Sequence, residues 1–155
     1  TECLLNEGGC MSAVTFFYRP NLFSKEIFIM CESRFYFCEK CGNLAGMIHS
    51  NGVPMYCCGE KMIHLDPSTS DQGKEKHLPS VKKDGDKLKV DIGEIPHPME
   101  EDHSISWVYL QTDRGGHRKC IATGDKPTVT FITCSETPLA VYAYCNKHGL
   151  MKKKI

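Results

Sequence analysis

Two pairs of cysteines stand close together in the first half of the chain, in a pattern typical of metal sites. In the first pair two residues separate the cysteines, the spacing at which one tight turn directs both sulfurs at a shared ion, and the second pair is adjacent. A glycine, Gly42 or Gly59, follows each pair and gives the backbone freedom to curl and to direct N–H groups at sulfur. The four cysteines are Cys38, Cys41, Cys57 and Cys58.

A closed site of four thiolates suits zinc or iron, so the residues alone leave the metal open. Spacing favours a structural zinc site, because such sites are common, although zinc ribbons usually close with a second C-x-x-C and not with an adjacent pair. Disulfides are a weaker alternative, because the chain begins Thr-Glu-Cys and carries no basic segment or long apolar run typical of a secretory signal. A reducing, cytoplasmic environment is therefore expected.

Three further segments, which read EKHLP, HPMEEDH and CNKHG, carry histidine or cysteine beside turn-forming residues. A single histidine is more often a surface or core residue than a ligand, but here four histidines accompany one cysteine. Five ligands are one too many for tetrahedral zinc, and they fit a square pyramid of imidazoles with an axial thiolate and an open sixth position. An open position on a redox-active, thiolate-bound metal indicates small-molecule chemistry. The five residues are His77, His97, His103, Cys145 and His148.

The overall composition narrows the function classes. The 155 residues suffice for one ordinary domain or two small ones. Formal net charge is zero, with 19 basic and 19 acidic residues, so no nucleic-acid or acidic-membrane partner is expected. No stretch approaches the roughly 18 consecutive apolar residues that a membrane helix needs.

The elements that must position these ligands are predicted to be strands in the second half of the chain. The runs KLKVDI, SISWVYL, TVTFI and LAVYAYC alternate or are rich in β-branched and aromatic residues, and turn signals separate them. Short strands at this spacing indicate a small antiparallel sandwich or barrel. The polar segment DPSTSDQGKEK, residues 66–76, is predicted to be a linker, and lysines 152–154 a solvated tail.

The same motifs resemble the desulfoferrodoxin family, the two-iron superoxide reductases. RFYFCEKCGN and CCGEKM are similar to the desulforedoxin-type iron module, and EKHLP, HPMEEDHSISWVYL and YCNKHGL are similar to the superoxide reductase catalytic domain. The resemblance implies a mainly β fold, in which a small desulforedoxin/rubredoxin-like module at 30–65 and the linker at 66–76 precede an immunoglobulin-like seven-stranded β-sandwich at 77–155. Residues 1–29 have no counterpart in the family and are expected to be an extension or a wrongly assigned start.

The resemblance also implies the role of each site residue. It favours iron over zinc in the four-cysteine site and places a second iron on four equatorial histidines and axial Cys145. Lys76 is similar to the lysine that guides superoxide, and Glu75 to the carboxylate that occupies the sixth position of the oxidised iron. The activity implied is one-electron reduction of superoxide to hydrogen peroxide in superoxide detoxification, by a homodimer that receives electrons from rubredoxin or a similar donor.

Three rival functions are separable by measurement: a superoxide dismutase, an electron-transfer protein with both metals closed, and a structural zinc module. One departure from the family is Leu150-Met151, which stands where an aromatic residue is usual and predicts altered packing near the site.

Five cysteines fall outside both ligand sets. Cys120 and Cys134 are predicted to be buried thiols in strands, whereas Cys3, Cys10 and Cys31 have no predicted role.

Overall fold

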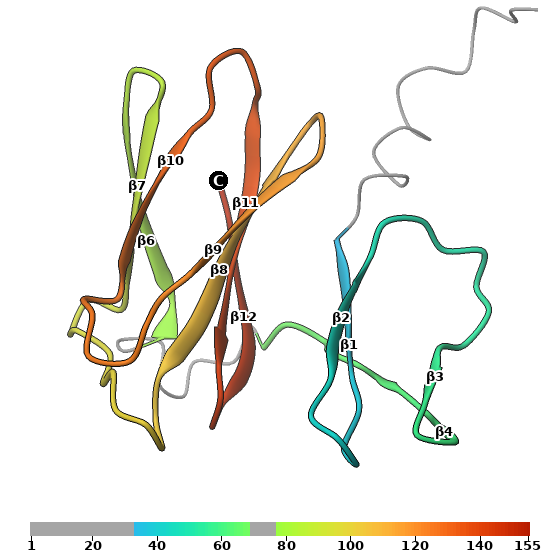
Figure 1. Ribbon diagram of the computed structural model, residues 1–155. Coiled ribbons are helices and arrows are strands. Elements are labelled where there is room, and N and C mark those ends of the chain that lie inside the picture. The colour runs from blue at the N-terminus through green and yellow to red at the C-terminus, as the bar shows by residue number, and fades with distance from the viewer. Residues whose placement is uncertain (1–32, 69–76) are drawn as a thin grey trace, which may run out of the picture.

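The computed structural model describes residues 33–68 and 77–155, which fold into two β-structured units lying side by side (Figure 1). Residues 1–29, Glu75 and Lys76 lie outside the described residues, so what the sequence predicts for them stays a prediction. Within the described ranges, no helix is long and apolar enough to cross a membrane.

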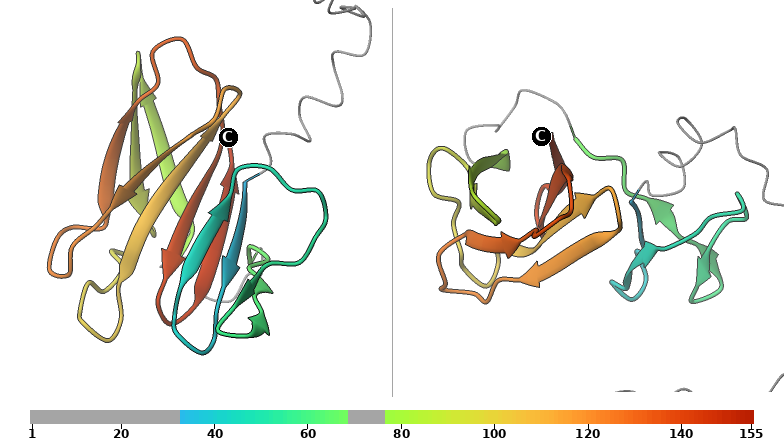
Figure 2. Two further views of the ribbon diagram at one scale, coloured as in Figure 1. Left: turned by 45° about the vertical axis from the view of Figure 1, so that its right-hand side comes forward. Right: turned by 90° about the horizontal axis from the view of Figure 1, so that it is seen from above.

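The C-terminal unit is a sandwich of two antiparallel sheets. Its strands are β6 (Pro79–Asp84), β7 (Lys87–Ile92), β8 (Ile105–Thr112), β9 (Gly116–Cys120), β10 (Thr128–Ile132), β11 (Pro138–Cys145) and β12 (Gly149–Lys154). The order is β10-β7-β6 in one sheet and β12-β11-β8-β9 in the other. Figure 2 shows the two sheets as separate layers. This is an immunoglobulin-like arrangement in which β9, the fourth strand of the sandwich, pairs with β8, the third. The predicted seven-stranded sandwich is therefore confirmed.

Alternation of apolar and polar residues builds the core between the sheets. In β7, Leu88, Val90 and Ile92 are buried, whereas Lys87 and Lys89 are exposed. The central strand β11 is buried along most of its length on both faces. One face belongs to the sandwich core and the other packs against the N-terminal unit, which explains why LAVYAYC is nearly continuously apolar.

The N-terminal unit is small and rests on the four-stranded sheet of the sandwich. Its strands are β1 (Arg34–Phe37), β2 (Leu44–Met47), β3 (Tyr56–Cys57), β4 (Glu60–Lys61) and β5 (Ile63–His64), with the order β2-β1-β5 in one sheet and β3-β4 as a hairpin. The Phe35 ring lies 5.0 Å from that of Trp107 and 5.6 Å from that of Tyr142. Ser68 N–H donates to the Leu150 carbonyl at 2.8 Å. The two units therefore share an apolar contact and a backbone hydrogen bond.

Three expectations drawn from the sequence are corrected by the structure. Lys152–Lys154 are not a free tail, because they complete β12 along β11, and the Lys152 ammonium lies 5.0 Å from the ring centroid of Tyr142. Cys120 and Cys134 are not buried, because both thiols are exposed. Cys120 ends an edge strand, and Cys134 lies in a turn with φ +44°.

Leu150 takes up a core position on the face of the sandwich that the small unit covers. It is 3% exposed and belongs to the cluster that includes Phe35 and Trp107. The aliphatic side chain at this departure from the family pattern is therefore packed against the contact between the two units.

Candidate metal centres

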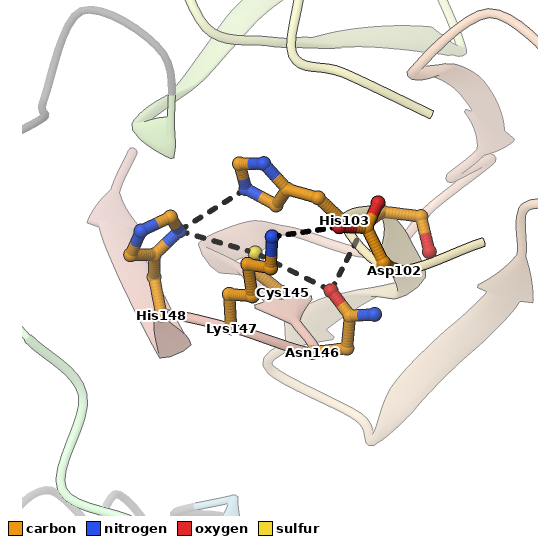
Figure 3. Close-up of polar contacts among 7 residues, drawn as sticks. Asp102, His103, Cys145, Asn146, Lys147 and His148 are labelled. Atoms are coloured by element: carbon orange, nitrogen blue, oxygen red, sulfur yellow. Dashed lines mark hydrogen bonds and ion pairs between the residues drawn. The ribbon is translucent and has the colours of Figure 1, made fainter. Parts of the chain in front are cut away.

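The four histidines and one cysteine predicted as a ligand set lie together at one end of the sandwich. Each offers one ligand atom, and these atoms all lie within 4.8 Å of one another. His77 stands two residues before the start of β6, and His97 and His103 stand in the connection from β7 to β8. Cys145 and His148 flank the turn from β11 to β12. Figure 3 shows His103 and His148 turned toward each other beside the Cys145 sulfur.

The pairing of two strands brings these segments to the same place. Because β8 and β11 are antiparallel, the start of one lies beside the end of the other, and Cys145 is the partner of Ile105. A register shift between Tyr144 and Cys145 marks an irregularity where the strand delivers the thiol. Asn146 fixes this corner, since its side-chain oxygen accepts from Ser104 N–H at 2.9 Å and its own N–H donates to the Ser104 carbonyl at 3.2 Å.

The four imidazoles form a closed ring. Centroid separations are 4.7 Å for His77–His97, 4.6 Å for His97–His103, 4.9 Å for His103–His148 and 4.3 Å for His148–His77, whereas His77 and His103 are 6.2 Å apart across the ring. The Cys145 sulfur lies 3.4 Å from Nδ1 of His148. Four nitrogens around a common point with one sulfur beside them suit a five-coordinate ion better than a tetrahedral one.

Hydrogen bonding selects the nitrogen that each ring offers. His97 Nδ1 lies 2.6 Å from the Pro98 carbonyl, which can only accept, so Nδ1 carries the proton and Nε2 keeps its lone pair. That Nε2 is buried and has no hydrogen-bond partner among the described residues, as expected of a ligand atom. Nδ1 of His148 faces Nε2 of His103 at 3.2 Å. His148 therefore presents Nδ1 to the site, whereas His97 presents Nε2.

Burial favours the neutral form of two of these rings, His97 and His148. Burial, followed by the neighbouring imidazoles, lowers the pKa of His97 to about 4, against the hydrogen bond to Pro98, which raises it. Burial, and to a lesser extent electrostatic repulsion by its neighbours, also lowers the pKa of His148. A neutral imidazole is the form that binds a metal, so no proton has to be displaced from these rings near pH 7.

The four cysteines form a second cluster, in the N-terminal unit, with their sulfurs within 4.8 Å of one another. Cys57 Sγ lies 3.6 Å from that of Cys41 and 3.8 Å from that of Cys58. The adjacent pair sits at the β3–β4 hairpin, where Cys58 and Gly59 have φ of +52° and +78°. Positive φ at both central residues defines a type I′ turn, which lets two neighbouring cysteines direct their sulfurs at one point.

Four sulfurs this close cannot all ionise without a cation among them. A hydrogen bond from the Asn43 backbone is the largest cause that lowers the pKa of Cys41 to about 7. The interaction with Cys41 in turn raises the pKa of Cys58 to about 12 and raises the pKa of Cys57. Asn43 also lies beside Cys57, with its amide nitrogen 3.6 Å from the sulfur. A divalent or trivalent cation would remove this conflict, so the donor set fits a tetrahedral metal.

Sequence reasoning missed the residues that support both ligand sets. Asn43 and Asn146 each follow a cysteine motif, and Pro98 follows a ligand candidate, but their hydrogen bonds depend on strand register and turn geometry. The available signal was the small amide residue inside or beside each cysteine turn. Lys147, also not singled out from the sequence, forms an ion pair with Asp102 at 3.0 Å on the exposed side of the cluster (Figure 3).

Comparison with known proteins places this arrangement in a wider group. The family model described as desulfoferrodoxin matches residues 69–154. A desulfoferrodoxin homolog of Archaeoglobus fulgidus is 40% identical over 115 residues, 74% of this chain and 91% of the relative. A desulfoferrodoxin of Syntrophotalea carbinolica is 41% identical over 115 residues, 74% of this chain and 90% of the relative. The crystal structure of the superoxide reductase from Treponema pallidum superposes with a TM-score of 0.68 at 31% identity, covering 79% of this chain and 98% of that one.

Proposed function

The chain belongs to the desulfoferrodoxin family, and on that premise we propose that it is a superoxide reductase, which reduces superoxide by one electron to hydrogen peroxide at iron bound by the His/Cys cluster. The observation that carries the proposal is the closed ring of four imidazoles beside one thiol. Further support is the fold shared with a solved protein that is named a superoxide reductase.

Two irons per chain are proposed, one in each cluster. One iron would be held by His77, His97, His103, His148 and Cys145, and the other by Cys38, Cys41, Cys57 and Cys58. Iron bound by these five ligands would provide one-electron redox chemistry, and the Cys145 thiolate would donate electron density to the metal. The donor count supports this assignment, because five protein ligands exceed what structural zinc binds and still leave one of six positions for a small anion.

The chain's own residues would then control access and charge. His77, His97 and Cys145 are buried, whereas His148 is exposed, so the anion would reach the cluster from the His148 side. Lys76 directly precedes His77, and its positive charge would attract superoxide and stabilise negative charge on the bound oxygen. Glu75 would occupy the sixth position when the metal is oxidised. Both roles rest on the resemblance and on adjacency in sequence to His77.

The setting of the reaction is also proposed. A rubredoxin or similar one-electron carrier would return the electron, and the protein would act as a cytoplasmic homodimer in superoxide detoxification. The domain limits of 30–65 and 77–155, joined by residues 66–76, agree with strands that end at His64 and resume at Pro79.

The proposal is tested by removing the axial thiolate. Iron-loaded protein with Cys145→Ser should lose the visible thiolate-to-iron band of the five-ligand site and consume superoxide no faster than buffer, while keeping the band of the four-cysteine site. Cys120→Ser removes an exposed thiol outside both clusters and should change neither property. Superoxide consumption at the full rate in Cys145→Ser would contradict the proposal.

Lys76→Ala separates guidance of superoxide from iron binding. Because the lysine is proposed to attract an anion, its loss should slow superoxide capture and weaken the dependence of that rate on ionic strength, with iron content unchanged. Stopped-flow measurement at several salt concentrations checks this. An unchanged rate would mean that Lys76 is ordinary surface charge.

A further inference from the structure

A line of packed aromatic rings crosses from the N-terminal unit to the strand that ends at Cys145. Phe35 lies in β1, the strand that leads into Cys38 of the four-cysteine cluster. Its ring is 5.0 Å from that of Trp107 in β8. Trp107 in turn stacks on Tyr144 of β11, with centroids 5.5 Å apart and planes within 4°. Tyr144 is the residue directly before Cys145, so the line runs from the strand that leads into one cluster to the residue that precedes a candidate ligand of the other.

Two of the three rings in this line are buried, and the third is partly buried. Trp107 is 7% exposed, and its cluster also contains Tyr142 and Leu150. A backbone route runs beside the rings. In it Leu65 N–H donates to the Phe35 carbonyl at 2.8 Å and Ser68 N–H donates to the Leu150 carbonyl at 2.8 Å. Leu150 is in turn the strand partner of Tyr144. Contact between the two units is therefore made by packed atoms, as in a protein interior.

We propose that Phe35, Trp107 and Tyr144 form the route by which one electron passes from the four-cysteine site to the His/Cys site. The inference rests on the proposed function, in which both sites hold iron. One electron moves: the iron held by the cysteines is oxidised from ferrous to ferric, and the other iron is reduced from ferric to ferrous. The rings serve as the contact path and neither gain nor lose a proton. A one-electron carrier protein supplies the electron at the start.

Two other rings in the same cluster provide a matched comparison. Tyr109 and Tyr142 contact Phe35 at 5.4 and 5.6 Å, but among the described residues neither has a ring contact with Tyr144. They lie beside the line and do not continue it toward Cys145. Tyr109→Leu therefore removes an aromatic ring from the same contact without interrupting the proposed route.

The experiment follows electron redistribution within the full-length, iron-loaded protein. Oxidised protein receives less than one electron per chain from a radiation pulse, and the visible band of each site is followed over time. In the natural sequence, the two bands should change in opposite directions at a rate independent of protein concentration. Trp107→Leu and Tyr144→Leu should each slow this step by about tenfold or more, and Tyr109→Leu should leave it within about twofold.

The outcomes separate this inference from the proposed function. The route would be overturned if Trp107→Leu redistributed the electron as fast as the natural sequence, or if Tyr109→Leu slowed the step as much as Trp107→Leu. It would also be overturned if the natural sequence showed no redistribution. Fully reduced protein mixed once with superoxide tests the proposed function alone, because no electron has to cross between sites, and all three variants should react normally. Far-ultraviolet circular dichroism and iron content verify folding, and Tyr144→Leu carries the test if Trp107→Leu fails to fold.

Discussion

Asn146 and Pro98 decide at the residue scale how two proposed ligands are presented. Asn146 holds the corner after Cys145 through two hydrogen bonds to Ser104, and the Pro98 carbonyl fixes the proton of His97 on Nδ1. Neither residue is a ligand candidate. Each instead restricts the orientation of a neighbouring ligand candidate. Groups outside the ligand set commonly tune a metal site in this way.

Replacing Asn146 should therefore weaken both the fold and the site. Asn146→Ala leaves the buried Ser104 N–H without its acceptor, which should lower the free energy of unfolding by about 1–3 kcal/mol. Asn146→Asp keeps an acceptor oxygen in the same place, so its free energy of unfolding should fall much less. Urea unfolding of the metal-free variants checks the difference, and equal losses in the two would show that the acceptor is not what matters.

The lowered pKa of His97 predicts how the metal-free protein responds to acid. Its pKa is about 4 in the folded protein against the usual 6.5, so between these values the unfolded chain binds more protons. The stability that the neutral ring contributes should be complete above pH 6.5 and should fall as pH drops toward 4. Urea midpoints across this range should fall less steeply in His97→Asn. His49→Asn, which changes an exposed histidine, should keep the natural slope, and an unaltered slope in His97→Asn would refute the assignment.

At the scale of elements, the sequence predicted those strands of the sandwich whose apolar residues alternate or run together. The limits of β7 and β10 coincide with the predicted runs KLKVDI and TVTFI. The strands of the sandwich that were not predicted, β6, β9 and β12, all lie at sheet edges, although the predicted β10 is an edge strand too. Their sequences PSVKKD, GHRKC and GLMKKK are rich in basic residues, which edge strands carry to discourage pairing with other chains and which hide the alternation of a strand.

The β3–β4 turn offers a test of how an element presents its ligands. Gly59 has φ +78°, and an added Cβ would meet nothing within 4 Å, so the cost of Gly59→Ala is backbone strain alone. We expect a loss of about 1–2 kcal/mol in stability, together with weaker metal binding by the four cysteines. Gly59→Asn should lose less stability and less metal affinity than Gly59→Ala, because asparagine tolerates a positive φ.

Gly46→Ala is the matched control for that turn. Gly46 lies in the same unit without a positive φ, and an added Cβ would make ordinary contact with the Phe35 ring at 3.5 Å. Its metal affinity should equal that of the natural sequence. Metal competition titrations compare the three variants, and unchanged affinity in Gly59→Ala would show that the turn does not need its left-handed conformation.

At the scale of the whole molecule, the two units are expected to unfold cooperatively through the Phe35 contact. Phe35 is 7% exposed and touches three aromatic rings of the sandwich. Phe35→Ala should cost about 3–5 kcal/mol, and the N-terminal unit should then unfold before the sandwich. Trp107, the only tryptophan of the chain, reports the loss of contact by fluorescence. Tyr36→Ala, on the opposite face of β1, should cost less, and a single unchanged transition in Phe35→Ala would contradict this expectation.

That contact could not be foreseen from the sequence, because it joins residues far apart in the chain whose meeting depends on both folds. Phe35 lies in a run that reads as part of the cysteine module, and Trp107 lies in a motif that reads as part of the sandwich. The ligand candidates were easier to find, since each stands beside a turn signal at a spacing that metals impose. Spacing nevertheless left zinc and iron open at the four-cysteine site, and the proposal of iron there comes from the resemblance to a family.

The amount of hydrogen peroxide formed per superoxide consumed tests the central claim most directly. Fully reduced, iron-loaded protein should receive a known amount of superoxide, and the peroxide produced should be measured with an electron donor present and absent. A superoxide reductase forms one peroxide for each superoxide and stops when its electrons are exhausted. Half that yield, with consumption continuing in the absence of a donor, would identify a dismutase and contradict the proposed function.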